Sequence, residues 1–270
     1  MILNVNGFDT YAYTGNHTID AALPTIIFIH GAANDHSVWS LQSRYFAYHG
    51  YNVLAVDLPG HGKSAGKVLD NIGALAQWTK ALMDAVGIGK AAVVGHSMGS
   101  LIGLETAARY KQNVSSLVMV GTAVPMPVTD ALLKASAAND HVAYEMVNVF
   151  AHSPRAQMGG NRLPGAWMTG NSMRLMERSG DGVLHADFTA CNNYSNGLEA
   201  AKEIQCPVLL LLGQRDLMTP PRAARVAASN FPHARTVLIA GAGHSLMSEQ
   251  PDAILDALID FLSAEAISAA

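Results

Sequence analysis

The sequence of 270 residues is poor in charge and in cysteine. Only 14% of the residues are charged, and the formal net charge is −4. No run of basic side chains offers a surface for nucleic acid or anionic lipid, so we expect neither partner. Two cysteines, Cys191 and Cys206, are too few for a disulfide framework, and this favours a reducing compartment over a secreted setting.

Long apolar runs are also lacking. The longest, such as Thr25–Ile29 and Pro207–Leu212, span five to seven residues, whereas about 20 are needed to cross a bilayer. The N-terminal residues show neither the basic region nor the uninterrupted apolar region of a signal peptide. We therefore expect a cytoplasmic protein without a membrane partner.

Apolar residues themselves are plentiful, at 50% of the chain. This content, together with the low net charge, excludes intrinsic disorder. A length of 270 residues is enough to bury a large core. At about 150 residues per domain, it predicts one large domain or one domain with an insertion.

Short apolar runs alternate with helical patterns along the chain. The runs do not alternate with polar residues, which is typical of strands covered on both faces of a parallel sheet. An Asn6-Gly7 pair near the N-terminus predicts a tight hairpin before them. The predicted strands are Thr25–His30, Asn52–Asp57, Ala91–Gly95, Leu117–Gly121, Pro207–Gly213 and Thr236–Gly241, and the predicted helices are Ile72–Val86, Met98–Tyr110, Pro221–Asn230 and Pro251–Ser263. This order predicts an α/β fold with a mostly parallel central sheet flanked by helices.

One interval, residues 123–205, interrupts the alternation. It contains helical patterns near Thr129–Phe150 and Met173–Glu177 around a loop-like stretch at residues 159–165, but no strand of the buried type. A structureless loop of this length is improbable in a compact domain. We therefore predict a helical insertion at 123–205 between two core segments, 1–122 and 206–270.

The most informative motif is Gly95-His96-Ser97-Met98-Gly99, which follows a predicted strand and precedes a predicted helix. This Gly-x-Ser-x-Gly arrangement holds a serine on a sharp turn with its hydroxyl exposed above the sheet. The amides and the positive dipole at the helix N-terminus are aimed at any oxyanion that forms there. Ser97 is therefore the candidate nucleophile.

A serine nucleophile needs a base and an acid that orients the base. Asp216 follows one predicted strand and His244 follows the last one. All three side chains then lie at the carboxyl ends of strands, where open α/β sheets form their sites. The backbone amides of Met98 and Ala32 are the candidate donors of an oxyanion hole.

These residues together resemble the α/β-hydrolase family over nearly the whole chain. The motifs are His30-Gly31, the run from Asp57 to Ser64, the serine turn, Gly213-x-x-Asp216 and Gly243-His244. By this resemblance Ser97 is the nucleophile, His244 the general base and acid, and Asp216 the orienting acid. The insertion looks like the family's helical cap, and hydrolysis through an acyl-enzyme without metal or cofactor is implied.

Other polar residues receive structural interpretations. His30, His61 and His96 are expected to position turns or to pack, and no His/Cys spacing suggests a metal site. Asp57 also ends a strand and is the rival to Asp216 as the acid. Cys191 is expected to be a buried small apolar residue.

The insertion is rich in methionine, and flexible thioethers can line an adaptable apolar pocket. We single out Trp167, Met126, Met146 and Met168 as candidate substrate-binding residues. Packing within the insertion is the competing interpretation of each. A pocket of this kind predicts a small to medium, weakly polar substrate.

Several functions fit these motifs. The leading hypothesis is hydrolysis of a small to medium carboxylic ester or lactone. Alternatives are a hydrolase of C–C bonds in ring-cleavage products, although Ala32-Ala33 replaces that group's usual glycine-rich stretch, and a perhydrolase or haloperoxidase-like enzyme. A ligand receptor on the same fold is the non-enzymatic alternative. The sequence does not identify the natural substrate. It also leaves open whether the protein forms a homo-oligomer.

Overall fold

The central sheet of the computed structural model contains all six strands predicted from the apolar runs. The structure describes residues 1–160, 162 and 165–268, and side chains as far as Ser263. In these residues eight strands form one sheet in the order β1-β2-β4-β3-β5-β6-β7-β8. They are β1 (Ile2–Val5), β2 (Phe8–Tyr13), β3 (Thr25–Ile29), β4 (Asn52–Val56), β5 (Ala91–His96), β6 (Val114–Val120), β7 (Val208–Gly213) and β8 (Ala234–Ile239).

The strands from β3 to β8 run parallel, whereas β1 and β2 form an antiparallel hairpin at one edge. Asn6 and Gly7 connect the hairpin with φ angles of 54° and 88°, as a type I′ turn requires. The prediction of a mostly parallel α/β sheet is confirmed.

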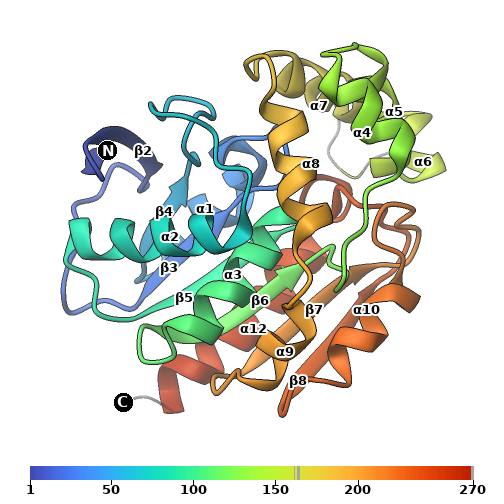
Figure 1. Ribbon diagram of the computed structural model, residues 1–270. Coiled ribbons are helices and arrows are strands. Elements are labelled where there is room, and N and C mark those ends of the chain that lie inside the picture. Colours follow the sequence, from blue (N-terminus) through green and yellow to red (C-terminus); the bar gives the residue numbers. More distant parts are fainter. Residues whose placement is uncertain (161, 163–164, 269–270) are drawn as a thin grey trace.

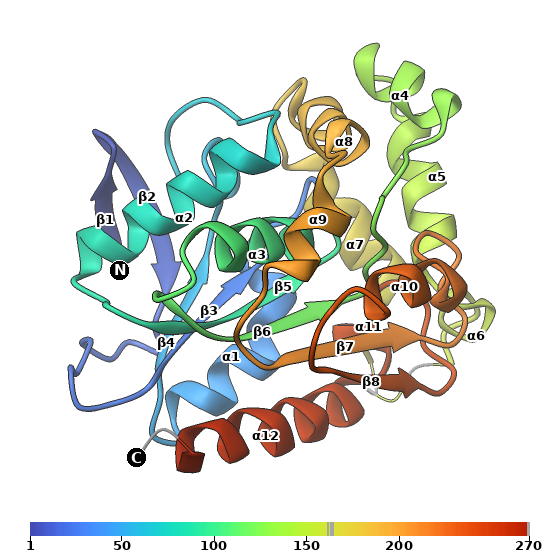
Figure 2. The same ribbon diagram turned by 60° about the horizontal axis from the view of Figure 1, so that its bottom comes forward.

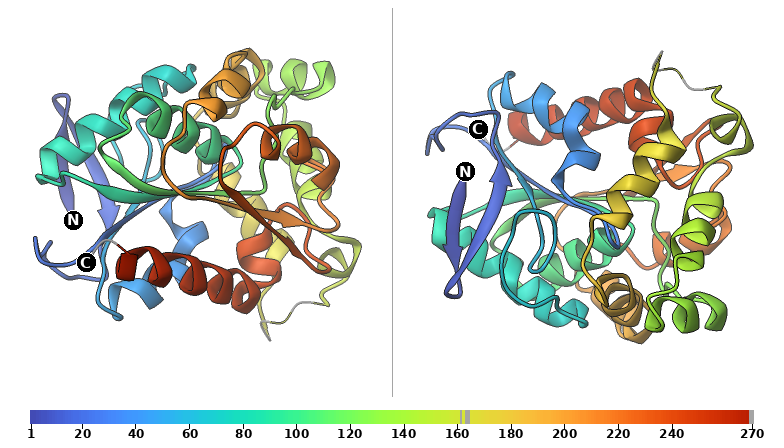
Figure 3. Two further views of the ribbon diagram at one scale, coloured as in Figure 1. Left: turned by 90° about the horizontal axis from the view of Figure 1, so that it is seen from below. Right: turned by 90° about the horizontal axis from the view of Figure 1, so that it is seen from above.

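Helices cover both faces of the sheet (Figures 1 and 2). The helices α2, α3, α9 (Gly197–Lys202) and α10 pack on one face and α1 and α12 on the other, as the view along the sheet in Figure 3 shows. The core helices are α1 (Ser40–Ala47), α2 (Ile72–Val86), α3 (Met98–Arg109), α10 (Pro221–Ala228), α11 (Leu246–Glu249) and α12 (Pro251–Ser268), with a short 3-10 helix at His36–Trp39.

Two separate apolar clusters explain why the strand sequences are continuously apolar. On β3, Ile27 and Ile29 belong to the cluster under α2 and α3, whereas Ile26 and Phe28 belong to the cluster under α1 and α12. Successive side chains of a strand point to opposite faces, so a strand covered on both faces must be apolar at every position. The edge strand β8 differs: only Ile239 is buried. The expectation of two covered faces is therefore wrong for β8.

Local signals account for the bounds of α2. Apolar residues recur at helical spacing along Ile72–Val86, and the side chain of Asn71 accepts a hydrogen bond from the Ala74 amide at 3.1 Å. Such a cap contributes about 1 kcal/mol. Gly87 ends the helix with φ of 76°, a conformation that glycine adopts at little cost.

Residues 123–205, which we call the inserted segment, lie between β6 and β7. In the described part of this segment the regular elements are helices, and most of the segment lies beyond the carboxyl ends of the strands (Figure 1). Its helices are α4 (Asp130–Ala137), α5 (Val142–Ala151), α6 (Pro154–Gln157), α7 (Met168–Glu177), α8 (Val183–Asn193) and α9 (Gly197–Lys202).

The helices of the inserted segment depart in detail from the predicted patterns. The pattern at Thr129–Phe150 forms two helices, because Asn139 adopts φ of 50° and interrupts the helical conformation between α4 and α5. The helices α6, α8 and α9 were not predicted. The predicted loop at 159–165 lies partly outside the described residues, since 161, 163 and 164 are not among them.

No helix within residues 1–160, 162 and 165–268 has the length and apolar composition needed to cross a membrane.

The turn between β5 and α3 depends on two glycines. A Cβ at Gly95 would overlap the Gly99 carbonyl, and a Cβ at Gly99 would overlap the carbonyl oxygens of Ile29 and His30. The neighbouring atoms are backbone, which cannot rotate away. The close approach of α3 to the sheet therefore requires glycine at both positions.

We expect Gly95→Ala to lower the free energy of unfolding by about 3 kcal/mol or more, because overpacking against backbone leaves no rotamer to relieve it. Urea denaturation followed by circular dichroism measures the change. The matched control is Gly89→Ala, where an added Cβ meets no atom within 4 Å. Equal stability of the two variants would contradict the packing argument.

Candidate active site

Ser97 lies on the turn between β5 and α3 in a strained conformation. Its φ of 52° and ψ of −118° are unusual for a residue with a side chain and persist only where the surroundings hold them. Here the Ser97 amide donates to the Val120 carbonyl at 2.9 Å, and the Ser100 hydroxyl donates to the Ser97 carbonyl at 2.6 Å. The turn thus has the geometry predicted for a nucleophile elbow.

His244 and Asp216 are joined by a hydrogen bond of 2.8 Å between Nδ1 and Oδ2. Each follows a parallel strand, β8 and β7 respectively. A neutral His244 ring that donates from Nδ1 keeps its lone pair on Nε2, the form that a general base needs. The structure therefore places a hydrogen-bonded His244–Asp216 pair at the cavity that Ser97 also lines, as a base and its orienting acid would require.

Thr219 completes the surroundings of Asp216. The carboxylate accepts hydrogen bonds from the Met218 and Thr219 amides at 2.9 and 2.8 Å and from the Thr219 hydroxyl at 2.7 Å. Burial by itself would raise the pKa of Asp216, but the charge and hydrogen bond of His244, with the Thr219 donors, hold the pKa below its ordinary value. Asp216 is therefore a carboxylate at neutral pH.

The loop that carries His244 is held from two sides. His96 donates from Nε2 to the His244 carbonyl at 2.9 Å. The buried Glu249 carboxylate accepts from the amides of Gly243, at 3.1 Å, and of Ser153 in the inserted segment, at 3.3 Å. Glu249 thus links the histidine loop to the inserted segment. The sequence reasoning missed it, because its partners are backbone amides.

The loop after β3 passes directly beside Ser97. A Cβ at Gly31 would lie 3.1 Å from the Ser97 Cβ, so glycine at this position lets the loop approach. Ala32 then lines the cavity in front of Ser97. Met98 has its amide in the first turn of α3 and its side chain fully buried in the core. The positions of both amides fit the predicted donors of an oxyanion hole.

The serine and histidine open into one cavity of about 550 Å³, which lies within the size range of ligand sites. The core contributes Ala32, Ser97 and His244 to its lining, and the inserted segment contributes Met168 and Phe188. The inserted segment therefore covers the cavity and supplies part of its wall.

Only one of the four candidate substrate-binding residues lines this cavity. Met168 does so. Met126 packs in the core under α3, and Met146 packs within the inserted segment. Trp167 is 68% exposed. These three side chains do not line the cavity, because Met126 and Trp167 lie outside the helices and the spacing of Met146 does not say which face of α5 turns to the cavity. Contact with substrate stays a prediction for them.

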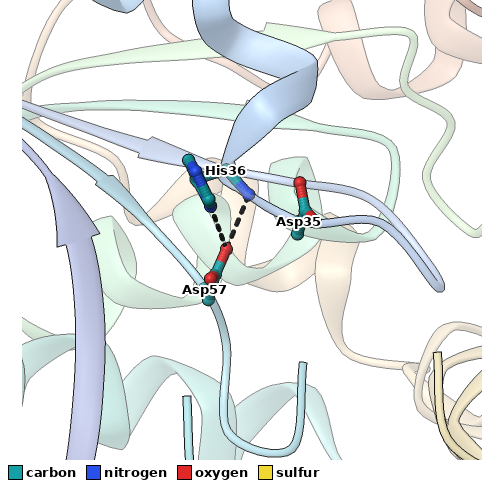
Figure 4. A group of neighbouring side chains, drawn as sticks. All are labelled: Asp35, His36 and Asp57. Carbon is teal, nitrogen blue, oxygen red and sulfur yellow. Dashed lines mark hydrogen bonds and ion pairs between the residues drawn. The ribbon is translucent and has the colours of Figure 1, made fainter. Parts of the chain in front are cut away.

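Asp57, the rival acid, serves the loops beside the site (Figure 4). It accepts hydrogen bonds from the amide and the ring Nδ1 of His36, both at 2.7 Å, and from the Lys63 amide at 2.9 Å. Burial would raise the pKa of Asp57, but the His36 donors and the Lys63 amide hold the pKa below its ordinary value. Asp57 thereby fixes two loops to each other.

The same three residues, Asp35, His36 and Asp57, place potential metal ligands within 4.8 Å of one another. All four carboxylate oxygens already have donors: those of Asp35 accept from the Ser37 amide and hydroxyl and from Arg178. The arrangement is fully explained by hydrogen bonds within the protein, and we assign no metal to it.

Two histidines near the site are buried and neutral. Burial first, then the neighbouring His61, lowers the pKa of His30 to about 4. Burial and the neighbouring His244 lower the pKa of His96 to about 3. The Nδ1 atom of His96 has no hydrogen-bond partner within the described part of the protein. Their geometry fits the expected positioning and packing roles.

A mostly parallel sheet, a serine on a strand-to-helix turn and an acid–histidine pair over a shared cavity define an α/β hydrolase. Comparison with known proteins agrees: the sequence model of the alpha/beta hydrolase fold matches residues 24–251. The chain belongs to the α/β-hydrolase fold family, and the resemblance found in the sequence is confirmed.

Relatives in this family act on different bonds. The chain is 28% identical over 253 residues to the 2-hydroxy-6-oxononadienedioate/2-hydroxy-6-oxononatrienedioate hydrolase of Comamonas testosteroni, covering 88% of this chain and 87% of that protein. The enol-lactonase structure from Burkholderia xenovorans has a TM-score of 0.85 at 23% identity, covering 97% of this chain and all of that one. An esterase from Exiguobacterium antarcticum has a TM-score of 0.84 at 17% identity, covering 97% and 99%. The two structures show a common fold.

We expect Asp216→Asn to lower kcat about 10⁴-fold, because the amide cannot hold His244 in the tautomer that leaves Nε2 free. Steady-state hydrolysis of an activated ester measures the loss. The control is Asp57→Asn, which removes a charge from the rival carboxylate and should leave kcat of the folded protein near that of the wild type. A larger loss in Asp57→Asn would assign the orienting acid to Asp57.

The buried His30 and His96 predict a loss of stability in mild acid. Both have a pKa below 6.5 in the folded chain, so unfolding lets them take up protons as the pH falls below about 6.5. The stability is complete above that pH and declines toward the folded pKa values, by about 2 kcal/mol for each ring at pH 5.

Urea denaturation at pH 7 and pH 5 measures this difference. His96→Gln should make it smaller by about 2 kcal/mol, because this ring no longer takes up a proton on unfolding. His49→Gln, at an exposed position, is the control. An unchanged pH dependence in His96→Gln would refute a neutral, buried His96.

Proposed function

We propose that this protein is a serine hydrolase that cleaves a small to medium carboxylic ester or lactone through an acyl-enzyme. Ser97 is the nucleophile, His244 the general base and acid, and Asp216 the orienting acid. The amides of Ala32 and Met98 stabilise the oxyanion. The observation that carries the proposal is the 2.8 Å bond between His244 and Asp216 beside a cavity that Ser97 also lines.

The reaction follows from these positions. The Ser97 Oγ attacks the carbonyl carbon while its proton passes to the His244 Nε2, and the carbonyl electrons move to the oxygen between the two amides. The tetrahedral adduct then expels the alkoxide, which takes the proton from His244. Water repeats the sequence on the acyl-enzyme and restores Ser97. Each step uses groups of the protein, so the proposed reaction requires neither metal nor cofactor.

The cavity supports a substrate of limited size. Its volume of about 550 Å³ suits a small or medium acyl or alcohol group. Methionines on its wall, namely Met168, Met176, Met218 and Met247, can adapt to different apolar shapes. The names of the structural relatives, an enol-lactonase and an esterase, agree with a carbonyl–oxygen bond as the target.

Hydrolysis of a C–C bond is the second candidate, and the Comamonas testosteroni relative favours it. The two reactions differ in the leaving group. An alkoxide accepts its proton at oxygen from His244, whereas a carbon leaving group must be protonated at carbon. Ala32-Ala33 stands where the C–C hydrolases usually have a glycine-rich stretch, which lowers this candidate below ester hydrolysis.

We also propose that the protein is cytoplasmic, as expected from its sequence.

We expect a fluorophosphonate probe to label the wild-type protein at Ser97, because the probe reacts with serine hydroxyls that have an adjacent base. Intact-protein and peptide mass spectrometry measure the labelling. Ser97→Ala should not be labelled, and His244→Ala should be labelled at least about 100-fold more slowly, the loss typical of a missing general base.

Absence of labelling in the wild-type protein would contradict the proposed enzymatic function and favour a ligand receptor on this fold. If labelling succeeds, nitrophenyl esters from acetate to decanoate and a 2-hydroxy-6-oxo-dienoate are assayed with Ser97→Ala as the blank. Turnover of the dienoate well above every ester would replace ester cleavage by C–C cleavage.

A further inference from the structure

Asp187 is a fully buried carboxylate that the proposed reaction does not use. It lies on α8 of the inserted segment, and its side chain has no exposed surface. Its Oδ2 accepts hydrogen bonds from the Ala33 amide at 2.8 Å and from the His61 Nε2 at 3.0 Å. A charge at this depth is costly unless it is paired and hydrogen-bonded. Its two partners both belong to core loops beside the cavity.

The contact with Asp187 favours the protonated form of His61. Burial alone would lower the pKa of His61, but the Asp187 charge and hydrogen bond, with a hydrogen bond to the Pro59 carbonyl, raise the pKa above its ordinary value. The His61 Nδ1 lies 3.1 Å from that carbonyl, so both ring nitrogens face acceptors. An imidazolium donates to both, and a hydrogen bond from a protonated ring to a carboxyl oxygen is among the stronger ones. The ring and the Ala33 amide converge on the Asp187 Oδ2, whereas Oδ1 has no partner among the described residues.

The Ala33 amide adjoins the predicted oxyanion donor. Ala33 adopts φ of 50°, a conformation that costs a residue with a side chain about 1 kcal/mol or more. The hydrogen bond to Asp187 holds the peptide plane between Ala32 and Ala33. Among the described residues Asp187 is the acceptor of that amide, while the Asn34 amide closes the turn on the Gly31 carbonyl at 3.3 Å.

The preceding peptide plane is held by His30. Its Nε2 accepts from the Leu58 amide at 3.1 Å, so its Nδ1 carries the proton and donates to the Gly31 carbonyl at 2.8 Å. The Gly31 carbonyl and the Ala32 N–H belong to one planar peptide and point in opposite directions. His30 and Asp187 therefore fix the two peptide planes on either side of the Ala32 Cα.

We propose that Asp187 is a positioning residue for the oxyanion hole: from the inserted segment, it holds the Ala33 amide and thereby orients the Ala32 N–H toward the substrate oxyanion. The hole is then complete only when α8 is docked on the core. This inference rests on the proposed serine hydrolase function.

Asp187→Ala tests the inference on an ester that the wild type turns over. We expect kcat/KM to fall about 10²- to 10³-fold, the loss typical of one oxyanion donor, mainly through kcat. A trifluoromethyl ketone, which forms a tetrahedral oxyanion with an active serine, should lose affinity by the same factor. Asp187→Asn keeps an oxygen acceptor for Ala33 and should lie between Asp187→Ala and the wild type in both measurements.

Leu184→Ala is the matched control. Leu184 lies on the same helix and is buried in the same segment, but its side chain offers no hydrogen bond to the loop. Thermal unfolding measures the stability of both variants, and active sites are counted by fluorophosphonate labelling. Leu184→Ala should lose stability while retaining kcat/KM per labelled site and inhibitor affinity.

The outcomes separate the two proposals. If Asp187→Ala matches Leu184→Ala in kcat/KM per labelled site and in inhibitor affinity, Asp187 is only a packing residue and the inference is overturned. If Asp187→Ala does not fold, the same comparison is made with Asp187→Asn, whose parallel losses in kcat and inhibitor affinity decide the matter. Absence of labelling in the wild type would instead overturn the proposed function.

Discussion

The close approach of α3 to the sheet at Gly95 and Gly99 is the constraint on which the site depends. Backbone packed against backbone leaves no freedom at the turn, so Ser97 is held at a positive φ. The strain at Ser97 is offset by the apolar contacts of the buried sheet and helices around it. A rigid core is thus what allows one residue to remain in an unfavourable conformation with its hydroxyl toward the cavity.

Two buried carboxylates join the inserted segment to the loops around that turn. Asp187 reaches from α8 to the loop after β3, and Glu249 reaches from α11 to Ser153 and to the loop of His244. Both carboxylates accept hydrogen bonds from backbone amides, so they hold the backbone conformation of the loops that carry those amides. The inserted segment is therefore linked by hydrogen bonds to both sides of the site, in addition to forming part of the cavity wall.

Much of the core could be predicted because its signals are local. The helix α2 matches its predicted bounds, because the residues that cap it are directly adjacent to it in the sequence: Asn71 precedes its first residue and Gly87 follows its last. The exposure of the edge strand β8 and the split between α4 and α5 were harder to predict from the sequence. The exposure of β8 follows from its place at the edge of the sheet that the described residues form, and the split follows from one residue, Asn139, in a left-handed conformation.

The sequence by itself determined the order of Ser97, Asp216 and His244 and their places at strand ends. Each follows a strand of the parallel sheet, and the carboxyl ends of parallel strands lie at one edge whatever the intervening chain does. Only the tertiary structure decided which side chains of the inserted segment face the cavity and that Asp187 meets Ala33. Those contacts depend on how each helix is rotated and docked, and 154 positions separate the two residues. The periodicity of apolar residues within one helix carries no information about how that helix is rotated or where it docks.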